Sequence, residues 1–214
     1  MDSNETEYAG GGIGRRLRLT RFHELTAEFR QYRIDDFIRG LEKGRSSGRI
    51  LAFVRGLRLS AQLIYALREA LSQTDLEVDW GHLLDEECRI CSPECDVIVH
   101  RRGHVIRWNG SVAPVMDFKF IESQKAVAVV SCKSLMRTVD AKHCQALRPY
   151  VSKVLLFAEC CRPNAVDRLR DRAQKAGYLG FWYLYTLNEE TSSPQQIDER
   201  QWEGFLSTLL DCCG

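Results

Sequence analysis

Apolar positions follow two different spacings along the chain, and the change between them divides the sequence. Over residues 20–44 and again over 49–73, apolar side chains recur every three to four residues, which is typical of helices. From residue 95 onward, short apolar runs of strand character follow one another, separated by turn signals such as Asn109-Gly110. The pattern therefore predicts two N-terminal helices followed by a sheet.

The second half of the chain alternates between predicted strands and predicted helices. Strands are expected at 95–101, 104–109, 113–118, 126–132, 153–160 and 179–187. Helices are expected at 138–149, 164–177 and 198–211. This order predicts an α/β fold, with a mixed central β-sheet flanked by helices and preceded by the N-terminal helical pair. We expect a flexible tail over 1–19, the helices over 20–74 and an α/β core over 75–214.

Composition and charge are those of an ordinary globular protein. The chain is 44% hydrophobic and 28% charged, which excludes a disordered or fibrous protein. Its 30 lysines and arginines nearly balance 29 aspartates and glutamates, so any site for a polyanion has to be local. No apolar run reaches the roughly 18 to 20 residues of a transmembrane helix, and the acidic N-terminus is unlike a signal peptide. We expect a cytoplasmic protein without membrane contact.

Nine cysteines are scattered along the chain, and reduced thiols explain them better than a disulfide framework. Cys88, Cys91 and Cys95 are closely spaced, but a structural zinc site normally needs four ligands in two spaced pairs. We therefore expect no zinc at these three residues.

A lysine closes the most apolar of the predicted strands and is the first candidate for chemistry. The run AVAVVSCKS, residues 126–134, places Lys133 directly after buried positions. Such a lysine can simply mark the point where a strand emerges into solvent. A functional role needs a partner, and Asp96 opens the strand DVIVH, where aspartate is otherwise disfavoured. If these two strands pair, Asp96 and Lys133 meet at one edge of the sheet.

The order of these residues resembles the motif of the PD-(D/E)xK phosphodiesterase superfamily, which includes many restriction endonucleases. In that superfamily a strand beginning with Asp precedes a hairpin and a later strand ending in (D/E)-x-K, and residues 95–134 are similar to one bacterial branch. The resemblance implies a DNA nuclease of the restriction or phage-defence type that uses Mg²⁺ or Mn²⁺. It makes Asp96 a metal ligand and Lys133 the residue that positions the attacking water.

The sequence departs from this motif at Ser131, which stands where the second carboxylate is expected. Some superfamily members with Ser-x-Lys take the missing carboxylate from the next helix, a little over a dozen residues downstream. That neighbourhood offers Asp140, Gln145 and Leu147 here, and no glutamate. The other carboxylates that could substitute as metal ligands or catalytic groups are Glu94, Glu122, Glu159 and, on the helix before the sheet, Glu69. The position that best matches the helical glutamate of the family is Gln62.

These neutral replacements leave a second function open. A catalytically degenerate relative would keep the fold and bind nucleic acid or a partner protein.

Candidate contacts to DNA lie close to the motif residues. Arg101, Arg102 and Arg107 belong to the hairpin that follows Asp96, and Ser134 follows Lys133; we expect them to contact the nucleic acid, the arginines through its backbone. The N-terminal helices are more apolar than a solvated extension requires. We expect them to form an interface, in a homodimer or with a larger defence complex.

Overall fold

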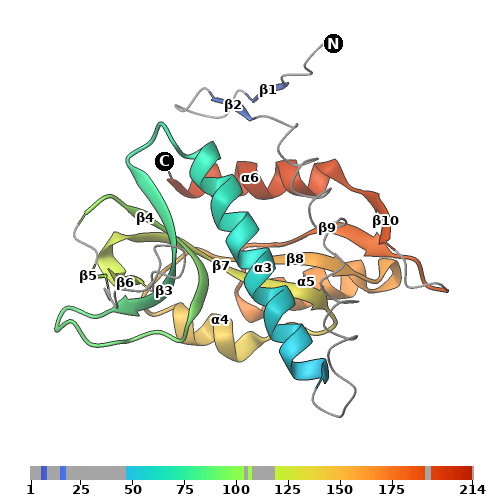
Figure 1. Ribbon diagram of the computed structural model, residues 1–214, viewed down its shortest axis with the longest axis horizontal. Coiled ribbons are helices and arrows are strands. Elements are labelled where there is room, and N and C mark those ends of the chain that lie inside the picture. The colour runs from blue at the N-terminus through green and yellow to red at the C-terminus, as the bar shows by residue number, and fades with distance from the viewer. Residues whose placement is uncertain are drawn as a thin grey trace.

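A mixed β-sheet forms the centre of the fold (Figure 1). The computed structural model describes residues 6–8, 15–17, 47–103, 106–107, 119–190 and 194–213. The strands of the sheet are β3 (Leu76–Leu84), β4 (Cys95–Arg101), β5 (Ile106–Arg107), β6 (Lys119–Glu122), β7 (Ala126–Met136), β8 (Val154–Cys161), β9 (Phe181–Leu187) and β10 (Pro194–Ile197). Their order across the sheet is β10-β9-β8-β7-β4-β3-β6-β5. A separate antiparallel pair, β1 (Thr6–Tyr8) and β2 (Arg15–Leu17), lies within the predicted tail.

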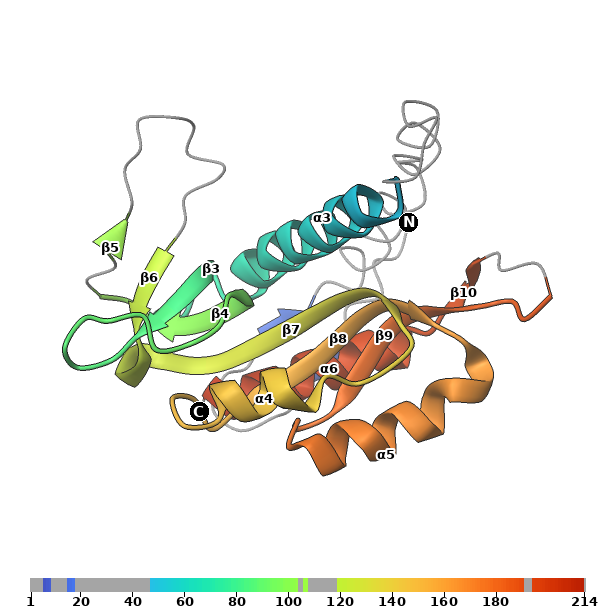
Figure 2. The ribbon, with the colours of Figure 1, turned by 90° about the horizontal axis from the view of Figure 1, so that it is seen from below.

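Helices cover both faces of the sheet. Figure 2 shows α3 (Ser47–Ala70) on one side of β7, and α4 (Ala141–Leu147) and α5 (Val166–Ala176) on the other. Side chains of α3 and of the last helix, α6 (Glu199–Cys213), share one apolar core with one face of the sheet. The residues of α4 and α5 share a second core with the opposite face. Every residue of β8 is buried, as expected for a central strand covered by helices on both faces.

Strand alternation assigns residues of β4 and β7 to these two cores. Val97 and Val130 belong to the α3 core, whereas Ile98 and Val129 belong to the α4 core. The two strands are antiparallel, and Val97 pairs with Val130. Strand β7 also pairs with β8 in parallel, so β7 has an antiparallel neighbour on one side and a parallel neighbour on the other.

The expected α/β architecture is confirmed, and its N-terminal part is confirmed only for the second helix. The helix expected over 49–73 is α3, whereas the one expected over 20–44 lies outside the described residues. The strand expected at 113–118 also lies outside them, and only β5 of the strand at 104–109 is described. No helix in the described part of the chain is long and apolar enough to cross a membrane.

Sequence patterning missed three short or polar strands, β3, β6 and β10. Strand β3 reads LEVDWGHLL, and its acidic side chains hid the alternation of Leu76 and Val78, which are buried in the α3 core. Its Asp79 is buried as well. The aspartate is tolerated there because Arg68 and His100 are bonded to it.

Strand β3 depends on a glycine where its pairing changes. Its register with β4 shifts between Asp79 and Gly81, and from Gly81 onward it also pairs with β6, opposite Lys119. Gly81 has φ of 144°, and a Cβ atom there would lie 1.9 Å from the Lys119 carbonyl oxygen. Only glycine combines this backbone conformation with such a close approach of two strands.

We expect Gly81→Ala to lower the free energy of unfolding by about 3 kcal/mol or more, because the new methyl group collides with backbone. Gly56→Ala is the control: it lies in α3 with open space around the Cβ position, and it should stabilise the helix by about 1 kcal/mol. Urea unfolding of both variants tests this, and equal stabilities would contradict it.

Candidate active site

The antiparallel pairing of β4 with β7 brings the motif residues together. Because Val97 pairs with Val130, the preceding residue of β4, Asp96, comes beside Ser131 of β7. The Cys132 N–H donates a hydrogen bond to Asp96 Oδ2 over 2.8 Å. This bond fixes the carboxylate against the backbone of the neighbouring strand and leaves its second oxygen available to a ligand.

Ser131 and Lys133 lie on the same face of the sheet as Asp96. Cys132 between them packs into the α3 core, so the residues on either side of it face α4. In the parallel ladder with β8, Lys133 pairs with Ala158, which belongs to the α4 core. The sequence prediction that Asp96 and Lys133 meet on neighbouring strands agrees with this geometry.

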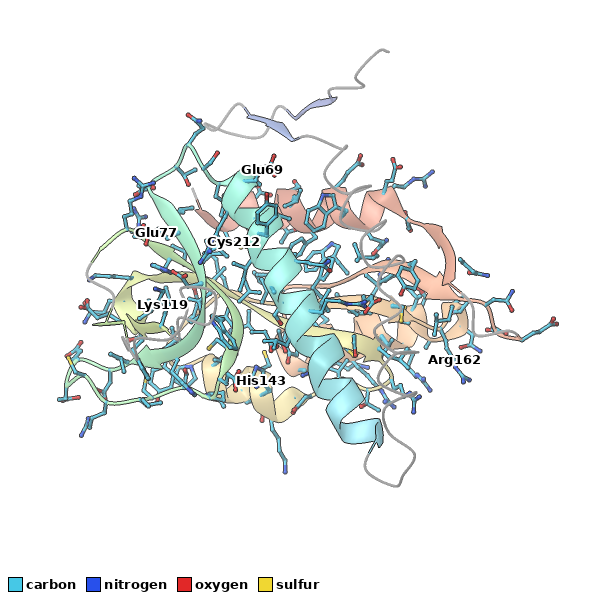
Figure 3. All side chains as sticks on the ribbon, in the orientation of Figure 1. Glu69, Glu77, Lys119, His143, Arg162 and Cys212 are labelled. Carbon is cyan, nitrogen blue, oxygen red and sulfur yellow. The ribbon has the colours of Figure 1, made fainter. Side chains whose placement is uncertain are left out.

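A histidine from α4 joins this group. Asp140 caps the helix, since its Oδ1 accepts a hydrogen bond of 3.1 Å from the His143 N–H. The Tyr178 hydroxyl donates to the Asp140 carbonyl oxygen over 3.0 Å, which ties the start of α4 to the segment after α5. Figure 3 shows His143 on this helix. The cap and the tyrosine together fix where the imidazole lies relative to β7.

Electrostatic effects show that the three ionisable groups are close to one another. Burial raises the pKa of the Asp96 carboxyl above its ordinary value. The Cys132 N–H, Lys133 and His143 act to lower this pKa and offset burial only in part. Burial and the Lys133 ammonium lower the pKa of His143, opposed by Asp96 and Asp140. The imidazole is therefore neutral at physiological pH and retains a nitrogen lone pair.

Two buried polar atoms at this place have no hydrogen-bond partner among the described residues. They are Ser131 Oγ and His143 Nε2. The Ser131 hydroxyl is near enough to Tyr178 to influence the pKa of that phenol, although it makes no hydrogen bond of ordinary geometry. Buried polar atoms are nearly always paired in proteins, and an unpaired one costs about 1 to 3 kcal/mol. Two such atoms beside a carboxylate fit a site that binds a cation together with its water or phosphate.

The carboxylates expected to assist Asp96 lie elsewhere. Glu69 is in the last turn of α3, which covers the opposite face of the sheet, and Figure 3 shows it far from His143. Glu94 is an exposed residue before β4. Glu122 ends β6 and forms a 3.0 Å ion pair with Lys125. In the described part of the chain, the ionisable side chains that act on the pKa of Asp96 are Lys133 and His143.

Glu159 and Gln62 also belong to the α3 face. The Glu159 carboxylate accepts hydrogen bonds from Arg58 over 3.0 Å and from the Tyr185 hydroxyl over 2.8 Å. Gln62 lies on α3 itself. The Arg58–Glu159 contact holds the helix to the sheet, on the opposite side from Asp96.

Two of the arginines expected to contact DNA lie far from Asp96. Arg101 and Arg102 are at the far end of β4, about 17 Å along the strand from Asp96. They pair with Asp75 over 3.7 Å and Glu77 over 3.6 Å. The Arg107 side chain is outside the described part of the structure. Ser134 is half-buried, and its carbonyl oxygen accepts a bond from Cys160 Sγ. Their role in DNA binding remains a prediction.

Sequence reasoning missed His143 because it searched for a carboxylate. The residue is twelve positions after Ser131, within the segment where a replacement ligand was sought. The three residues considered as a replacement ligand have other places in the structure. Asp140 is the helix cap, Gln145 is exposed and Leu147 is part of the α4 core.

A second polar cluster lies on β3 and β4. Glu77, Asp79 and His100 offer ligand atoms within 4.8 Å of one another and could hold a metal ion. However, Asp79 Oδ1 already accepts a bond of 2.6 Å from Arg68. His100 Nε2 lies 3.1 Å from Asp79 Oδ2, and its Nδ1 lies 3.0 Å from the Arg101 carbonyl oxygen.

Asp79 and both ring nitrogens of His100 are therefore already in polar contacts within the protein. This arrangement favours an internal charge network over a metal site.

The three closely spaced cysteines do not converge on one point. Cys91 Sγ donates to the Leu83 carbonyl oxygen over 3.4 Å, and Cys95 Sγ donates to that of Pro93 over 3.5 Å. Burial raises the pKa of Cys95 to about 12, which disfavours the thiolate that zinc requires. Cys88 is exposed.

Comparison with known proteins shows the fold. The match to cAAA-bound NucC from P. aeruginosa ATCC27853 covers 91% of this chain and 89% of that protein, with 10% identity and a TM-score of 0.53. The match to cAAA-bound NucC from E. coli MS115-1 covers 94% of this chain and 91% of that protein, with 12% identity and a TM-score of 0.52. No protein-family model and no curated protein matches the sequence. At these identities the likeness shows the fold, so the chain shares the α/β fold of NucC.

We expect Asp79→Asn to lower the free energy of unfolding at pH 7 by about 2 to 3 kcal/mol, because it leaves Arg68 and His100 without their anion. Burial raises the pKa of Asp79, but the His100 hydrogen bond and Arg68 outweigh it, so the folded-state pKa is below normal. This stabilisation is therefore present above about pH 4 and is lost as the pH falls through the folded-state pKa.

Thermal unfolding across pH measures the effect. Asp171→Asn, which breaks the exposed pair with Lys175, is the control and should change stability little. An Asp79→Asn variant as stable as the natural protein at pH 7 would contradict the network.

Asp96→Asn should have the opposite effect, with a melting temperature at pH 7 equal to or above that of the natural protein. The folded-state pKa of Asp96 is raised, mainly by burial, so its carboxylate disfavours the fold increasingly as the pH rises through that pKa. Asparagine keeps an acceptor for the Cys132 N–H without the charge. The same thermal series tests this, and a clear loss of stability at pH 7 would show that Asp96 is structural.

Proposed function

We propose that this chain, which has the restriction-endonuclease-like fold of NucC, is a metal-dependent nuclease that hydrolyses phosphodiester bonds in DNA. The observation that carries the proposal is the placement of Asp96, Ser131 and Lys133 on one face of two paired strands, where the Cys132 N–H holds the carboxylate. The similarity of residues 95–134 to the superfamily motif supports a role in restriction or phage defence.

Each residue has a distinct part in this reaction. Asp96 offers its free oxygen to Mg²⁺ or Mn²⁺, while its other oxygen is held by backbone. A bound divalent cation supplies an activated water and neutralises charge on the phosphate. Lys133 is close enough to Asp96 to affect its pKa, so its ammonium group can orient that water and stabilise the charge that develops on the phosphate. Ser131 adds a neutral oxygen.

A protein that binds nucleic acid without cleaving it is the second candidate. It is favoured by Ser131, because a hydroxyl carries no charge with which to hold a hard cation. This candidate predicts binding that depends on lysine and arginine and is indifferent to divalent metal.

A plasmid assay distinguishes the nuclease from the protein that only binds nucleic acid. The purified chain is incubated with supercoiled plasmid DNA in the presence of Mg²⁺, Mn²⁺ or a chelator. We expect metal-dependent nicking or linearisation, reduced at least about 100-fold by Lys133→Ala and by Asp96→Asn, since both remove transition-state stabilisation. Lys142→Ala, at an exposed lysine on α4, is the matched control and should cut normally.

The same proteins are assayed for DNA binding by fluorescence anisotropy. Full cleavage by the Lys133→Ala and Asp96→Asn variants would overturn the proposed nuclease site. Binding without cleavage under every metal condition would establish the second candidate.

A further inference from the structure

We propose that His143 replaces the missing carboxylate as a metal ligand, so that the site selects a transition-metal dication over Mg²⁺. This inference rests on the proposed function, because it places the metal at Asp96. It adds a nitrogen ligand from α4, and with it a metal preference that the oxygen ligands of the family motif do not give.

The first support is the position of the imidazole. His143 lies on α4, which packs on the face of the sheet that carries Asp96, Ser131 and Lys133, and it acts on the pKa of Asp96. The Asp140 cap and the Tyr178 hydroxyl hold this end of the helix. A metal ligand has to be fixed in this way, because a mobile side chain loses affinity to ordering entropy.

The second support is the unpaired state of the donor atoms. Nε2 of His143 and Oγ of Ser131 are buried, and neither has a hydrogen-bond partner among the described residues. Ser131 comes beside Asp96 in the register of β4 with β7, and His143 is on the helix that packs on this face. A cation with its water molecules would satisfy all three side chains at once, whereas each is costly to bury without a partner.

The mixture of ligands then decides which metal fits. Mg²⁺ prefers oxygen ligands and is usually held by carboxylates and phosphates. A site with one carboxylate, one imidazole and one hydroxyl has a single negative charge, and imidazole binds the later first-row metals more strongly. The affinity should therefore rise from Mg²⁺ through Mn²⁺ to Co²⁺. Three protein ligands leave open positions for water and for the phosphate of the substrate.

The test measures metal binding on the full chain, independently of cleavage. Metal-free protein is titrated calorimetrically with Mg²⁺, Mn²⁺ and Co²⁺, and Co²⁺ binding is also followed by visible absorption, which responds to nitrogen ligation. We expect Co²⁺ to bind at least about tenfold more tightly than Mg²⁺. Circular dichroism confirms that each variant is folded.

Two substitutions of the same residue give opposite results if His143 is a ligand. His143→Gln removes the imidazole lone pair and should weaken Co²⁺ binding by about 10- to 100-fold. His143→Glu supplies the missing carboxylate and should shift the preference toward Mg²⁺. Lys142→Ala, on the same turn of α4, should leave both affinities unchanged.

Three further outcomes separate this inference from the proposed function. Co²⁺ binding that survives His143→Gln but not Asp96→Asn overturns the role of His143 and leaves the nuclease site intact. Binding that survives both substitutions overturns both proposals, and its loss in Glu77→Gln would then place the metal in the β3–β4 cluster. A natural protein that binds none of the metals overturns the His143 role, while the plasmid assay decides the nuclease independently.

Discussion

The register between β4 and β7 is the constraint on which the candidate site depends. With Val97 opposite Val130, the chain has to place Asp96 beside Ser131 and within reach of the Cys132 N–H. A slip of one residue in either strand would turn the side chains of that strand over, so that Asp96 and Lys133 would lie on opposite faces of the sheet. The apolar residues of both strands fix the register, since they are divided between two cores. The packing of the sheet therefore positions the polar residues.

Buried charges in the described part of the sheet are compensated to different degrees. On the α3 face, Glu159 is bonded by Arg58 and Tyr185, and on β3 Asp79 is bonded by Arg68 and His100. Such charges are internally compensated and stabilise the arrangement of helix and strand. At Asp96, burial raises the pKa, and the Cys132 N–H, Lys133 and His143 offset this only in part. Unmet electrostatic requirements of this kind are concentrated at functional sites.

The sequence was informative where a single residue type carried a clear physical meaning. An aspartate opening an apolar strand and a lysine closing another were sufficient to predict that Asp96 and Lys133 meet. Strand β3 was missed because Asp79 interrupts its apolar pattern, and only tertiary contacts with Arg68 and His100 make that aspartate tolerable. Glu69 and Glu122 were suggested by the family resemblance and Glu94 by its spacing from Asp96, and none of these grounds includes the tertiary contacts that decide where a side chain lies.

His143 illustrates why the family motif is an incomplete guide to this site. A ligand set has to meet a requirement for lone pairs in a given space, and different residues on different elements can meet it. Ser131 is fully buried on β7. Its side chain is shorter than that of Asp or Glu and carries no charge, so it does not replace a carboxylate. Helix α4 packs on the face of the sheet that carries Ser131, and under the proposed role of His143 its imidazole supplies the lone pair that a carboxylate would give. The neutral serine on the strand and the imidazole on the helix would then together set the metal that the site prefers.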